Sequence, residues 1–527
     1  MIILGIGGVL GDAASAILID GRLAAAVEES KLTRRAQGRQ GELPDESIAM
    51  CLDLARVRAD QVDCVSVARP IPASPEGGLH LKLRSRFPNS RMALIDHHRA
   101  HAASAFYLSP FDEARVLVLD RRGDFRCGSR WRGAENQLSL EKEMYSADSL
   151  GELYGRVTEL LGFNSNADEH KVQWFSASGE DRYRDVFLEM TQCDSGDWPR
   201  LDRSYFDAER MTGGGFSAKF FTRIGLPDRA DIPARERAAV AAGLQGAIET
   251  MVIAMAGENG NLCVAGGLGL NALLVEALEF SGKFSNVFVQ PAAGNAGTAL
   301  GAVLEAWHSL YRQPQRVSLG NLCLGPSYTA EQIKQVLENC KLRFRYLLTS
   351  DELIDAAVAR LSENKIVAWM HGRMEFGPRA LGNRSILASP VDPFAAENLN
   401  NYIKHRESFR KFAASVPAEL APEFFEVGPN ARYLATVGRV REQYRKCFES
   451  AILAGDLIRV HVVSEQDNPL YWKLLHAAGK KSGLPVLYNT SFNLFGEPLV
   501  CTPRDAVRSF YSSGIDAMFV GNFFLQK

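Results

Sequence analysis

The chain has 527 residues, of which 46% are hydrophobic and 23% are charged, and its formal net charge is -2. This length predicts more than one domain, and the composition is that of an ordinary globular protein. With so little net charge, no overall basic field favours nucleic acid as a partner.

The sequence also predicts neither secretion nor a membrane location. Residues 1–21 are apolar, but they lack a basic region and are interrupted by glycines and by Asp12, so they predict a strand and a turn rather than a signal peptide. No uninterrupted apolar run is long enough to span a bilayer. Nine scattered cysteines, an odd number, argue against a disulfide framework. We therefore expect a cytoplasmic protein.

The first part of the chain predicts a short β-unit. Strands are expected at residues 2–7, 16–19 and 23–27, joined by a turn that carries Asp12 and by a hairpin. An acidic helix start follows at Glu28.

A later segment repeats this arrangement. Residues 115–120, RVLVLD, predict a strand that ends at Asp120, and residues 127–131 resume extended structure after a polar turn. Two strand–acidic turn–strand units in series favour an α/β fold with a duplicated ribonuclease-H-like domain, as in the actin/Hsp70 ATPase superfamily.

Two glycine-rich turns follow. Residues 261–270, NLCVAGGLGL, predict a buried strand that ends at Gly266 and Gly267, and residues 290–301, QPAAGNAGTALG, open a helix. Free backbone N–H groups at such turns bind phosphate. The pair therefore favours a nucleotide cleft over simple turns.

The DHHRAH segment, residues 96–101, is a candidate metal site. His97 and His101 are four residues apart, so on a helix they share one face. Asp120 is the expected oxygen ligand, and this donor set suits a divalent first-row metal. Taken alone, two histidines at this spacing are more often structural.

The domain boundary is expected near residue 345, before an amphipathic helix that starts at Asp351 and a strand at 365–370. The polar segment 181–232 either caps a substrate site or is a variable insertion.

An anion-binding cradle is expected in the second domain. Residues 374–385, MEFGPRALGNRS, place two arginines among glycines and a proline, which let a backbone approach a ligand while guanidinium groups grip phosphate or carboxylate. Residues 404–411 supply further cations, and residues 487–493, LYNTSFN, crowd amides and hydroxyls at a strand end. The alternative is a solvated basic face with a loop.

These ordered blocks resemble the NodU/CmcH-type O-carbamoyltransferases, which include the tobramycin carbamoyltransferase, and the resemblance covers nearly the whole chain. It implies an N-terminal domain, residues 1–345, similar to the tRNA threonylcarbamoyl transferases. It also implies a C-terminal domain, residues 346–527, similar to threonylcarbamoyl-AMP synthase (YrdC-like).

The resemblance implies two linked half-reactions. In the C-terminal domain, carbamoyl phosphate and ATP would give carbamoyl-adenylate, releasing pyrophosphate and phosphate. In the N-terminal domain, a hydroxyl of a small natural-product acceptor would attack a carbonyl polarised by a bound metal, which in the family is iron.

The resemblance also assigns the site residues. The catalytic set is Lys404, Arg379, Arg410, Ser491 and His170. The set for substrate and ATP binding is Arg384, Arg459, Asn489, Asn493, Asp12, Lys171, Gly266, Gly267, Asn271 and Asn295. The metal set is His97, His101 and Asp120.

Four positions depart from the family pattern, all in the N-terminal cleft. Gly11 stands where relatives carry a histidine, Asn295 where they carry a metal-binding aspartate, and His170 and Arg121 where they carry glycine. Metal binding is therefore expected to be weakened or lost. We hypothesise that His170 replaces the missing base or a metal ligand; the alternative is a surface histidine.

Three functional hypotheses remain at this point. The first is an ATP-dependent carbamoyltransferase acting on a small secondary metabolite. The second keeps carbamoyl-adenylate formation but ends in transfer to an amine or in hydrolysis. The third is a non-catalytic homologue. The acceptor, the general base and a homodimeric state stay open.

Overall fold

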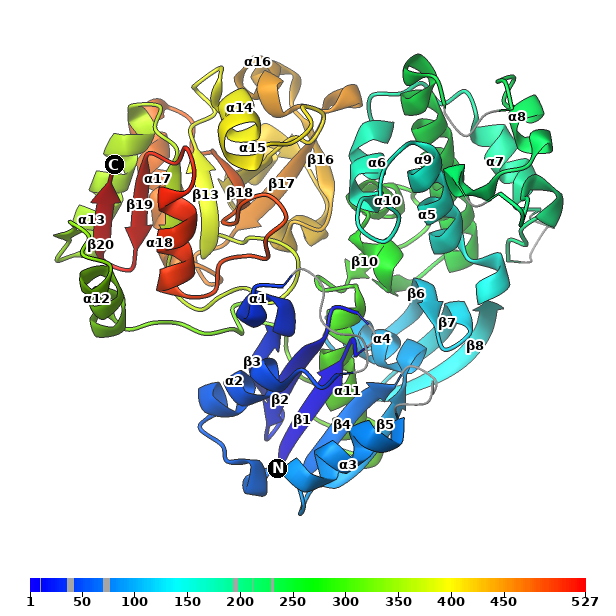
Figure 1. Ribbon diagram of the computed structural model, residues 1–527, viewed down its shortest axis with the longest axis horizontal. Coiled ribbons are helices and arrows are strands. Elements are labelled where there is room, and N and C mark those ends of the chain that lie inside the picture. The colour runs from blue at the N-terminus through cyan, green and yellow to red at the C-terminus, as the bar shows by residue number, and fades with distance from the viewer. Residues whose placement is uncertain (10, 36–41, 70–75, 193–197, 211, 229–231) are drawn as a thin grey trace.

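The computed structural model describes residues 1–9, 11–35, 42–69, 76–192, 198–210, 212–228 and 232–527. Within these residues the strands form three sheets flanked by helices, so the predicted α/β architecture is confirmed. Two five-stranded sheets lie in the N-terminal half and one ten-stranded sheet in the C-terminal half (Figure 1).

The first sheet has the strand order β3-β2-β1-β4-β5. β2 pairs antiparallel with β1 and with β3, whereas β4 and β5 extend the sheet in parallel. The three strands expected at the start of the chain are therefore confirmed. The strands are β1 (Ile2–Gly7), β2 (Ala14–Ile19), β3 (Arg22–Glu28), β4 (Cys64–Arg69) and β5 (Arg91–Asp96).

The second sheet, β10-β9-β6-β7-β8, repeats this topology. β6, β7 and β8 form an antiparallel run, and β9 and β10 extend it in parallel from β6. The two strand units expected from the sequence thus form two sheets with the same strand order and strand directions. Its strands are β6 (Glu113–Gly123), β7 (Arg126–Ala134), β8 (Gln137–Tyr145), β9 (Asn261–Ala265) and β10 (Asn286–Val289).

Close packing of α11 (Thr298–Glu305) joins the elements that carry the N-terminal site. A Cβ on Gly7 of β1 would lie 2.3 Å from the backbone nitrogen of Ala299, and a Cβ on Gly301 would lie 1.8 Å from the carbonyl oxygen of Ala100 in α4 (His97–Phe106). Only glycine permits these approaches. They fix β1, α4 and the turn of Asn295 next to one another.

Helices cover the N-terminal sheets. The segment 181–232 contributes Phe187, Tyr205 and Phe220 to the same buried core as α9. By length and composition α9 could cross a membrane, but 61% of its apolar window is buried in the core, which accounts for its composition. The helices are α1 (Glu29–Thr33), α2 (Asp45–Ala55), α3 (Glu76–Arg86), α5 (Leu150–Leu160), α6 (Glu169–Ser176), α7 (Arg184–Met190), α8 (Ala218–Arg223), α9 (Ala234–Ala256) and α10 (Ala272–Glu279).

The C-terminal sheet has the order β11-β20-β19-β12-β13-β18-β14-β17-β16-β15. Successive side chains of β12 alternate between two cores: Ala368 packs with α12 and α18, whereas Trp369 packs with α13 and α17. The strands are β11 (Arg345–Tyr346), β12 (Val367–Met370), β13 (Arg384–Ala388), β14 (Ala413–Pro417), β15 (Phe425–Glu426), β16 (Val437–Val440), β17 (Leu457–Val463), β18 (Leu487–Ser491), β19 (Ala517–Val520) and β20 (Phe523–Gln526).

The boundary near residue 345 stays a prediction, but one helix before it packs with the C-terminal sheet. Ile333 and Leu337 of α12 lie in the core of that sheet. Helix α1, at the end of β3, faces the C-terminal half (Figure 1). The helices of this half are α12 (Ala330–Asn339), α13 (Ser350–Ser362), α14 (Ala395–Asn398), α15 (Ala421–Phe424), α16 (Arg445–Phe448), α17 (Pro469–Ser482) and α18 (Pro503–Tyr511).

Candidate active site

A cavity of about 300 Å³ lies between the two halves of the chain. Asp12 and Asn295 line it from the N-terminal half, and Gly377, Ser491 and Asn493 line it from the C-terminal half. Residues that the sequence assigns to separate domains therefore face one space.

An ion pair from the N-terminal half clasps the arginine-bearing turn. Lys31 Nζ donates to the carbonyl oxygens of Glu375 at 2.9 Å and Gly377 at 2.7 Å, and lies 2.8 Å from Glu28 Oε1. The same Glu28 oxygen accepts the N–H of Gly377 at 2.7 Å. Burial raises the pKa of Glu28, and the charge of Lys31 opposes that rise. Sequence reasoning noticed the acidic helix start but missed this clasp.

Glu375, a residue of the arginine-bearing turn itself, also stabilises this turn. Glu375 is fully buried, and its Oε1 accepts the N–H groups of Leu381 at 2.8 Å, Asn383 at 2.8 Å and Arg384 at 3.1 Å. Gly377 has φ +100°, a left-handed conformation that favours glycine. Together with the clasp, these bonds set the path of the turn past the cavity.

Arg384 lies apart from the cavity, which corrects the expectation that it grips substrate. Its side chain is fully buried, so its guanidinium has no solvent or ligand space around it. All its hydrogen bonds are to backbone carbonyls, which indicates that it stabilises the turn. The acceptors are His371 at 2.8 Å, Gly372 at 3.3 Å, Asn383 at 3.0 Å and Pro326 at 3.2 Å.

A cluster of five cations lies beside this turn. Its members are Arg379, Lys404, Arg406, Arg410 and Arg459, which we call the cation cluster. Burial lowers the pKa of Arg379 to about 10, and burial together with Arg410 lowers that of Arg406 to about 9. Burial, and then the charges of three of these arginines, holds the pKa of Arg459 well below its usual range. Half-buried and buried cations that repel one another favour an anion between them.

Two members of the cation cluster, Arg379 and Arg459, have few partners among the described residues. Arg379 donates to the carbonyl oxygen of Leu270 at 3.0 Å, which reaches across to the N-terminal half. Arg459 lies over the ring of Trp174 at 5.0 Å, and its Nε has no hydrogen-bond partner among the described residues. Glu407 lies 3.8 Å from Arg410. The region of the predicted anion cradle therefore carries more positive than negative charge.

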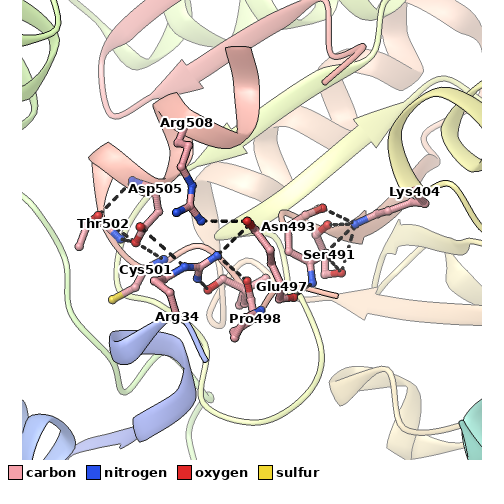
Figure 2. Close-up of polar contacts among 11 residues, drawn as sticks. Arg34, Lys404, Ser491, Asn493, Glu497, Pro498, Cys501, Thr502, Asp505 and Arg508 are labelled. Atoms are coloured by element: carbon pink, nitrogen blue, oxygen red, sulfur yellow. Dashed lines mark hydrogen bonds and ion pairs between the residues drawn. The ribbon is translucent and has the colours of Figure 1, made fainter. Parts of the chain in front are cut away.

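The loop after β18 closes the cradle from the other side. Lys404 Nζ donates to the carbonyl oxygen of Ser491 at 2.5 Å, to that of Asn493 at 2.9 Å and to Asn493 Oδ1 at 2.7 Å. Figure 2 shows the far end of the loop, where Glu497 contacts Arg34 at 3.3 Å and Arg508 at 2.9 Å. Arg34 belongs to the N-terminal half, so this loop also joins the two halves. Nothing in the sequence pattern pointed to Arg34.

Asn489, two residues before Ser491, is held from both sides. Its Nδ2 donates to the carbonyl oxygen of Ala380 at 3.1 Å and to Ser415 Oγ at 3.2 Å, and its Oδ1 has no partner among the described residues. The residue is buried beneath the arginine-bearing turn. This places Asn489 where it supports the turn.

His97, His101 and Asp120 form the compact cluster that the sequence predicts. Their donor atoms lie within 4.8 Å of one another, and all three side chains are buried. Asp120 Oδ2 is 2.9 Å from His97 Nε2 and 3.4 Å from His101 Nε2. Burial alone would raise the pKa of Asp120, but the bonds from His101 and His97 hold it well below its usual range.

This cluster fits a divalent metal. His101 Nδ1 is buried and has no hydrogen-bond partner among the described residues, and Nε2 has only the 3.4 Å contact with Asp120, which is costly for an imidazole unless a ligand binds it. Two histidine nitrogens and one carboxylate also suit a first-row divalent ion.

The two glycine-rich turns adjoin the metal cluster. A Cβ on Gly267 would lie 3.4 Å from Asp120 Oδ1, and a Cβ on Gly11 would lie 3.9 Å from Asn295 Nδ2. Burial, and then the charge of Asp120, raises the pKa of Asp12. Gly11 and Asn295, two of the four positions expected to depart from the family pattern, therefore lie side by side, next to Asp12.

Two residues expected to bind nucleotide are engaged elsewhere. Asn271 Oδ1 caps α10 by accepting from Leu274 at 3.1 Å, and its Nδ2 donates to Gln245 at 2.9 Å. The N–H of Gly266 donates to the carbonyl oxygen of Ala293 at 2.9 Å, so this amide is not free for a phosphate. Both residues therefore stabilise the glycine-rich turn after β9.

His170 and Lys171 face the C-terminal half. Lys171 Nζ lies 3.1 Å from both Asp168 and Glu407. The His170 side chain is exposed, and desolvation by the surrounding protein, and next Arg410, lower its pKa to about 4. The metal cluster found among the described residues does not include His170, so its role as a substitute ligand stays a hypothesis without structural support. A pKa of about 4 also makes it a weak base.

Family comparisons cover most of the chain. Residues 77–304 match the model described as "Carbamoyltransferase N-terminus", and residues 358–527 match "Carbamoyltransferase C-terminus". The uncharacterized protein sll1178 of Synechocystis sp. is 34% identical over 100% of this chain and 96% of its own length. Nodulation protein NolNO of Sinorhizobium fredii is 31% identical over 98% of this chain and 79% of its own.

A relative with a named activity matches half of the chain. The 3'-hydroxymethylcephem-O-carbamoyltransferase of Amycolatopsis lactamdurans is 32% identical over 51% of this chain and 49% of its own length. The resemblance stated from the sequence is thus confirmed. The chain belongs to the carbamoyltransferase family, whose members are group-transferring enzymes.

Proposed function

We propose that the protein is an ATP-dependent carbamoyltransferase that carbamoylates a hydroxyl of a small natural-product acceptor. The observation that carries this proposal is the single cavity onto which both the arginine-bearing turn and the Asp12–Asn295 wall open. The relative named as a cephem O-carbamoyltransferase supports a hydroxyl acceptor.

The first half-reaction is assigned to residues 346–527, which we propose form a threonylcarbamoyl-AMP synthase-like domain. Water converts carbamoyl phosphate into carbamate and phosphate. A carbamate oxygen then attacks the α-phosphorus of ATP, the bond to pyrophosphate breaks, and carbamoyl-adenylate forms. Arg379, Arg410 and Arg459 neutralise the polyanions, while Ser491 and Asn493 orient the carbamoyl group.

The second half-reaction is assigned to residues 1–345, which we propose form a duplicated ribonuclease-H-like domain. The acceptor oxygen attacks the carbamoyl carbon, the bond from that carbon to the AMP oxygen breaks, and the hydroxyl proton is released. Asp12 and Gly267 lie where they can position the adenylate beside His97, His101 and Asp120. A divalent metal held by these three residues would supply Lewis-acid polarisation of the carbonyl.

The proposed setting is the cytoplasm, with carbamoyl phosphate, ATP and the acceptor as partners. The eight cysteines among the described residues are all free thiols, which suits a reducing compartment.

The test is to incubate the purified full chain with ATP and carbamoyl phosphate and to measure pyrophosphate release. Release should require both substrates, and carbamoyl-adenylate should be detected by mass spectrometry. Acetyl phosphate in place of carbamoyl phosphate is the matched control. Pyrophosphate release that is independent of carbamoyl phosphate would overturn the proposal.

A second candidate keeps carbamoyl-adenylate formation but ends in hydrolysis or in transfer to an amine. Gly11 and Asn295 beside the metal cluster favour it, because they remove an imidazole and a carboxylate that relatives carry there. Product analysis separates the two: free AMP with no carbamoylated alcohol supports the second candidate.

A further inference from the structure

Phe495 stands at the tip of the loop that follows β18. The N–H of Glu497 donates to the carbonyl oxygen of Leu494 at 3.2 Å, which closes a tight turn, and Gly496 has φ +72° at its third position. Phe495 at the second position is 65% exposed. No packing need of the described fold accounts for an apolar ring at this place.

Both stems of this turn are fixed. On one side Asn493 accepts from Lys404 at 2.7 Å, and its own Nδ2 donates to the carbonyl oxygen of Glu497 at 2.6 Å. On the other side Glu497 is gripped by Arg34 and Arg508 (Figure 2). The exposed ring is therefore presented from an anchored loop, which reduces the entropy lost when a ligand binds to it.

A pocket of about 440 Å³ opens next to Phe495. Its other wall comes from the π-helical turn η8 (Leu399–Lys404) and the residues after it, and π-helical turns are frequent at functional sites. His405, which follows η8, has φ +45°, a left-handed conformation that is uncommon for a non-glycine residue. The pocket residues are Asn400, Asn401, His405, Arg406, Glu407 and Phe495.

The pocket is continuous with the cation cluster, because Arg406 belongs to both. Lys404, another member, also holds the Phe495 loop. The pocket thus combines an aromatic ring, side-chain amides and a carboxylate with the half-buried positive charge of Arg406, which donates to Asn400 Oδ1 at 2.8 Å. This combination matches a nucleotide, whose base stacks on rings, whose hydroxyls donate to carboxylates and whose phosphates bind cations.

We infer that this pocket takes the base of the nucleotide whose phosphates the cation cluster binds, with Phe495 stacked on the base and Glu407 or Asn401 facing the ribose. The inference deepens the proposed function and rests on it for the identity of the nucleotide, ATP. None of the residues expected to bind ATP from the sequence lies in this pocket.

The test compares Phe495→Ala with Phe394→Ala, an equally apolar change at a side chain that is 61% exposed in the same half but does not line the pocket. Loss of one stacked base should raise the KM for ATP about 5- to 150-fold in Phe495→Ala. Phe495→Trp should restore it, and Phe394→Ala should behave as the unmodified protein.

Inorganic tripolyphosphate, which has no base, separates base stacking from loop damage. Its inhibition constant should be the same in Phe495→Ala and in the unmodified protein. Equal loss of ATP and tripolyphosphate binding, or an unchanged KM for ATP, would overturn the inference. If the unmodified protein releases no pyrophosphate, the proposed function fails, and calorimetric titration of ATP and tripolyphosphate into the same variants still decides the role of Phe495.

Discussion

Lys404 Nζ donates to Asn493 Oδ1 at 2.7 Å, so the one lysine of the cation cluster holds the loop that lines the cavity. Burial, and then Arg406 and Arg410, hold the pKa of Lys404 well below its usual range. An incoming anion would compete for the same ammonium and would offset the repulsion from the arginines. Substrate binding and the position of the loop are therefore linked through this side chain.

The first prediction is proton uptake on anion binding. An anion beside Lys404 favours its charged form, so the pKa rises on binding and a proton is taken from the buffer. Calorimetric titration of ATP at pH 8 in buffers of different ionisation enthalpy measures this uptake. Lys404→Met should take up fewer protons than the unmodified protein. Proton release on binding would contradict the prediction.

Arg379→Ala should strongly impair pyrophosphate release that depends on carbamoyl phosphate. Loss of one charge-assisted contact, worth about 1.5–3 kcal/mol, corresponds to a decrease of about 10- to 150-fold. Lys404→Ala is expected to have a similar effect. Arg504→Ala, an exposed arginine of α18, is the control and should retain full activity. Normal activity of Arg379→Ala would show that the cation cluster does not bind the substrates.

The Glu28–Lys31 clasp should matter for stability. Lys31→Met leaves a buried carboxylate unpaired, and breaking a buried pair in this way costs about 3–5 kcal/mol of the free energy of unfolding. Glu28→Gln in the same chain removes that charge while keeping an acceptor for Gly377, so the double variant should recover much of the loss. Urea unfolding of Lys31→Met, of Glu28→Gln alone and of the double variant measures both effects. Additive losses in the double variant would show that the pair is not coupled.

Metal content tests the effect of Asn295. A neutral amide in place of a carboxylate removes one negative charge from the surroundings of His97, His101 and Asp120, so affinity for a divalent ion should fall. Metal analysis of protein purified without chelators should show substoichiometric iron, and Asn295→Asp should raise the occupancy. Full occupancy in the unmodified protein would show that another ligand compensates.

The sequence predicted the parts of the fold and site that depend on local pattern. Strand β1 follows from an apolar run ended by glycines, and the pairing of His97 with His101 follows from helical spacing. Contacts between distant residues left no such pattern. Lys31 meets Gly377 across 346 positions of the chain, and Arg34 meets Glu497 across 463.

Residue type was also a poor guide to the direction of a side chain. Arg384 and Arg379 lie five positions apart in one motif, yet Arg384 donates to carbonyls inside the turn whereas Arg379 joins the cation cluster. Asn271 follows a glycine-rich turn as a phosphate ligand would, but its side chain caps α10. In each case the side chain is hydrogen-bonded to backbone groups that folding buries, because buried backbone groups require partners. Which backbone groups will be buried cannot be read from the residue type.

The last prediction concerns His170, whose neighbours are Arg410 and Arg379 rather than the metal cluster. In the unfolded chain a histidine titrates near pH 6.5, whereas the folded protein lowers the pKa of His170 to about 4. The folded state therefore binds fewer protons than the unfolded state between these values, so stability is lost as the pH falls from 6.5 toward 4. His170→Gly removes this contribution, and its free energy of unfolding should fall less over that window.

The same variant separates the remaining roles of His170. We expect carbamoyl-phosphate-dependent pyrophosphate release to persist in His170→Gly, because a neutral imidazole contributes no charge to the cation cluster at pH 7. If pyrophosphate release persists while transfer to the acceptor collapses, His170 serves the second half-reaction although it does not belong to the metal cluster. Stability curves that run parallel for the variant and the unmodified protein between pH 6.5 and 4 would show instead that folding does not suppress protonation of His170.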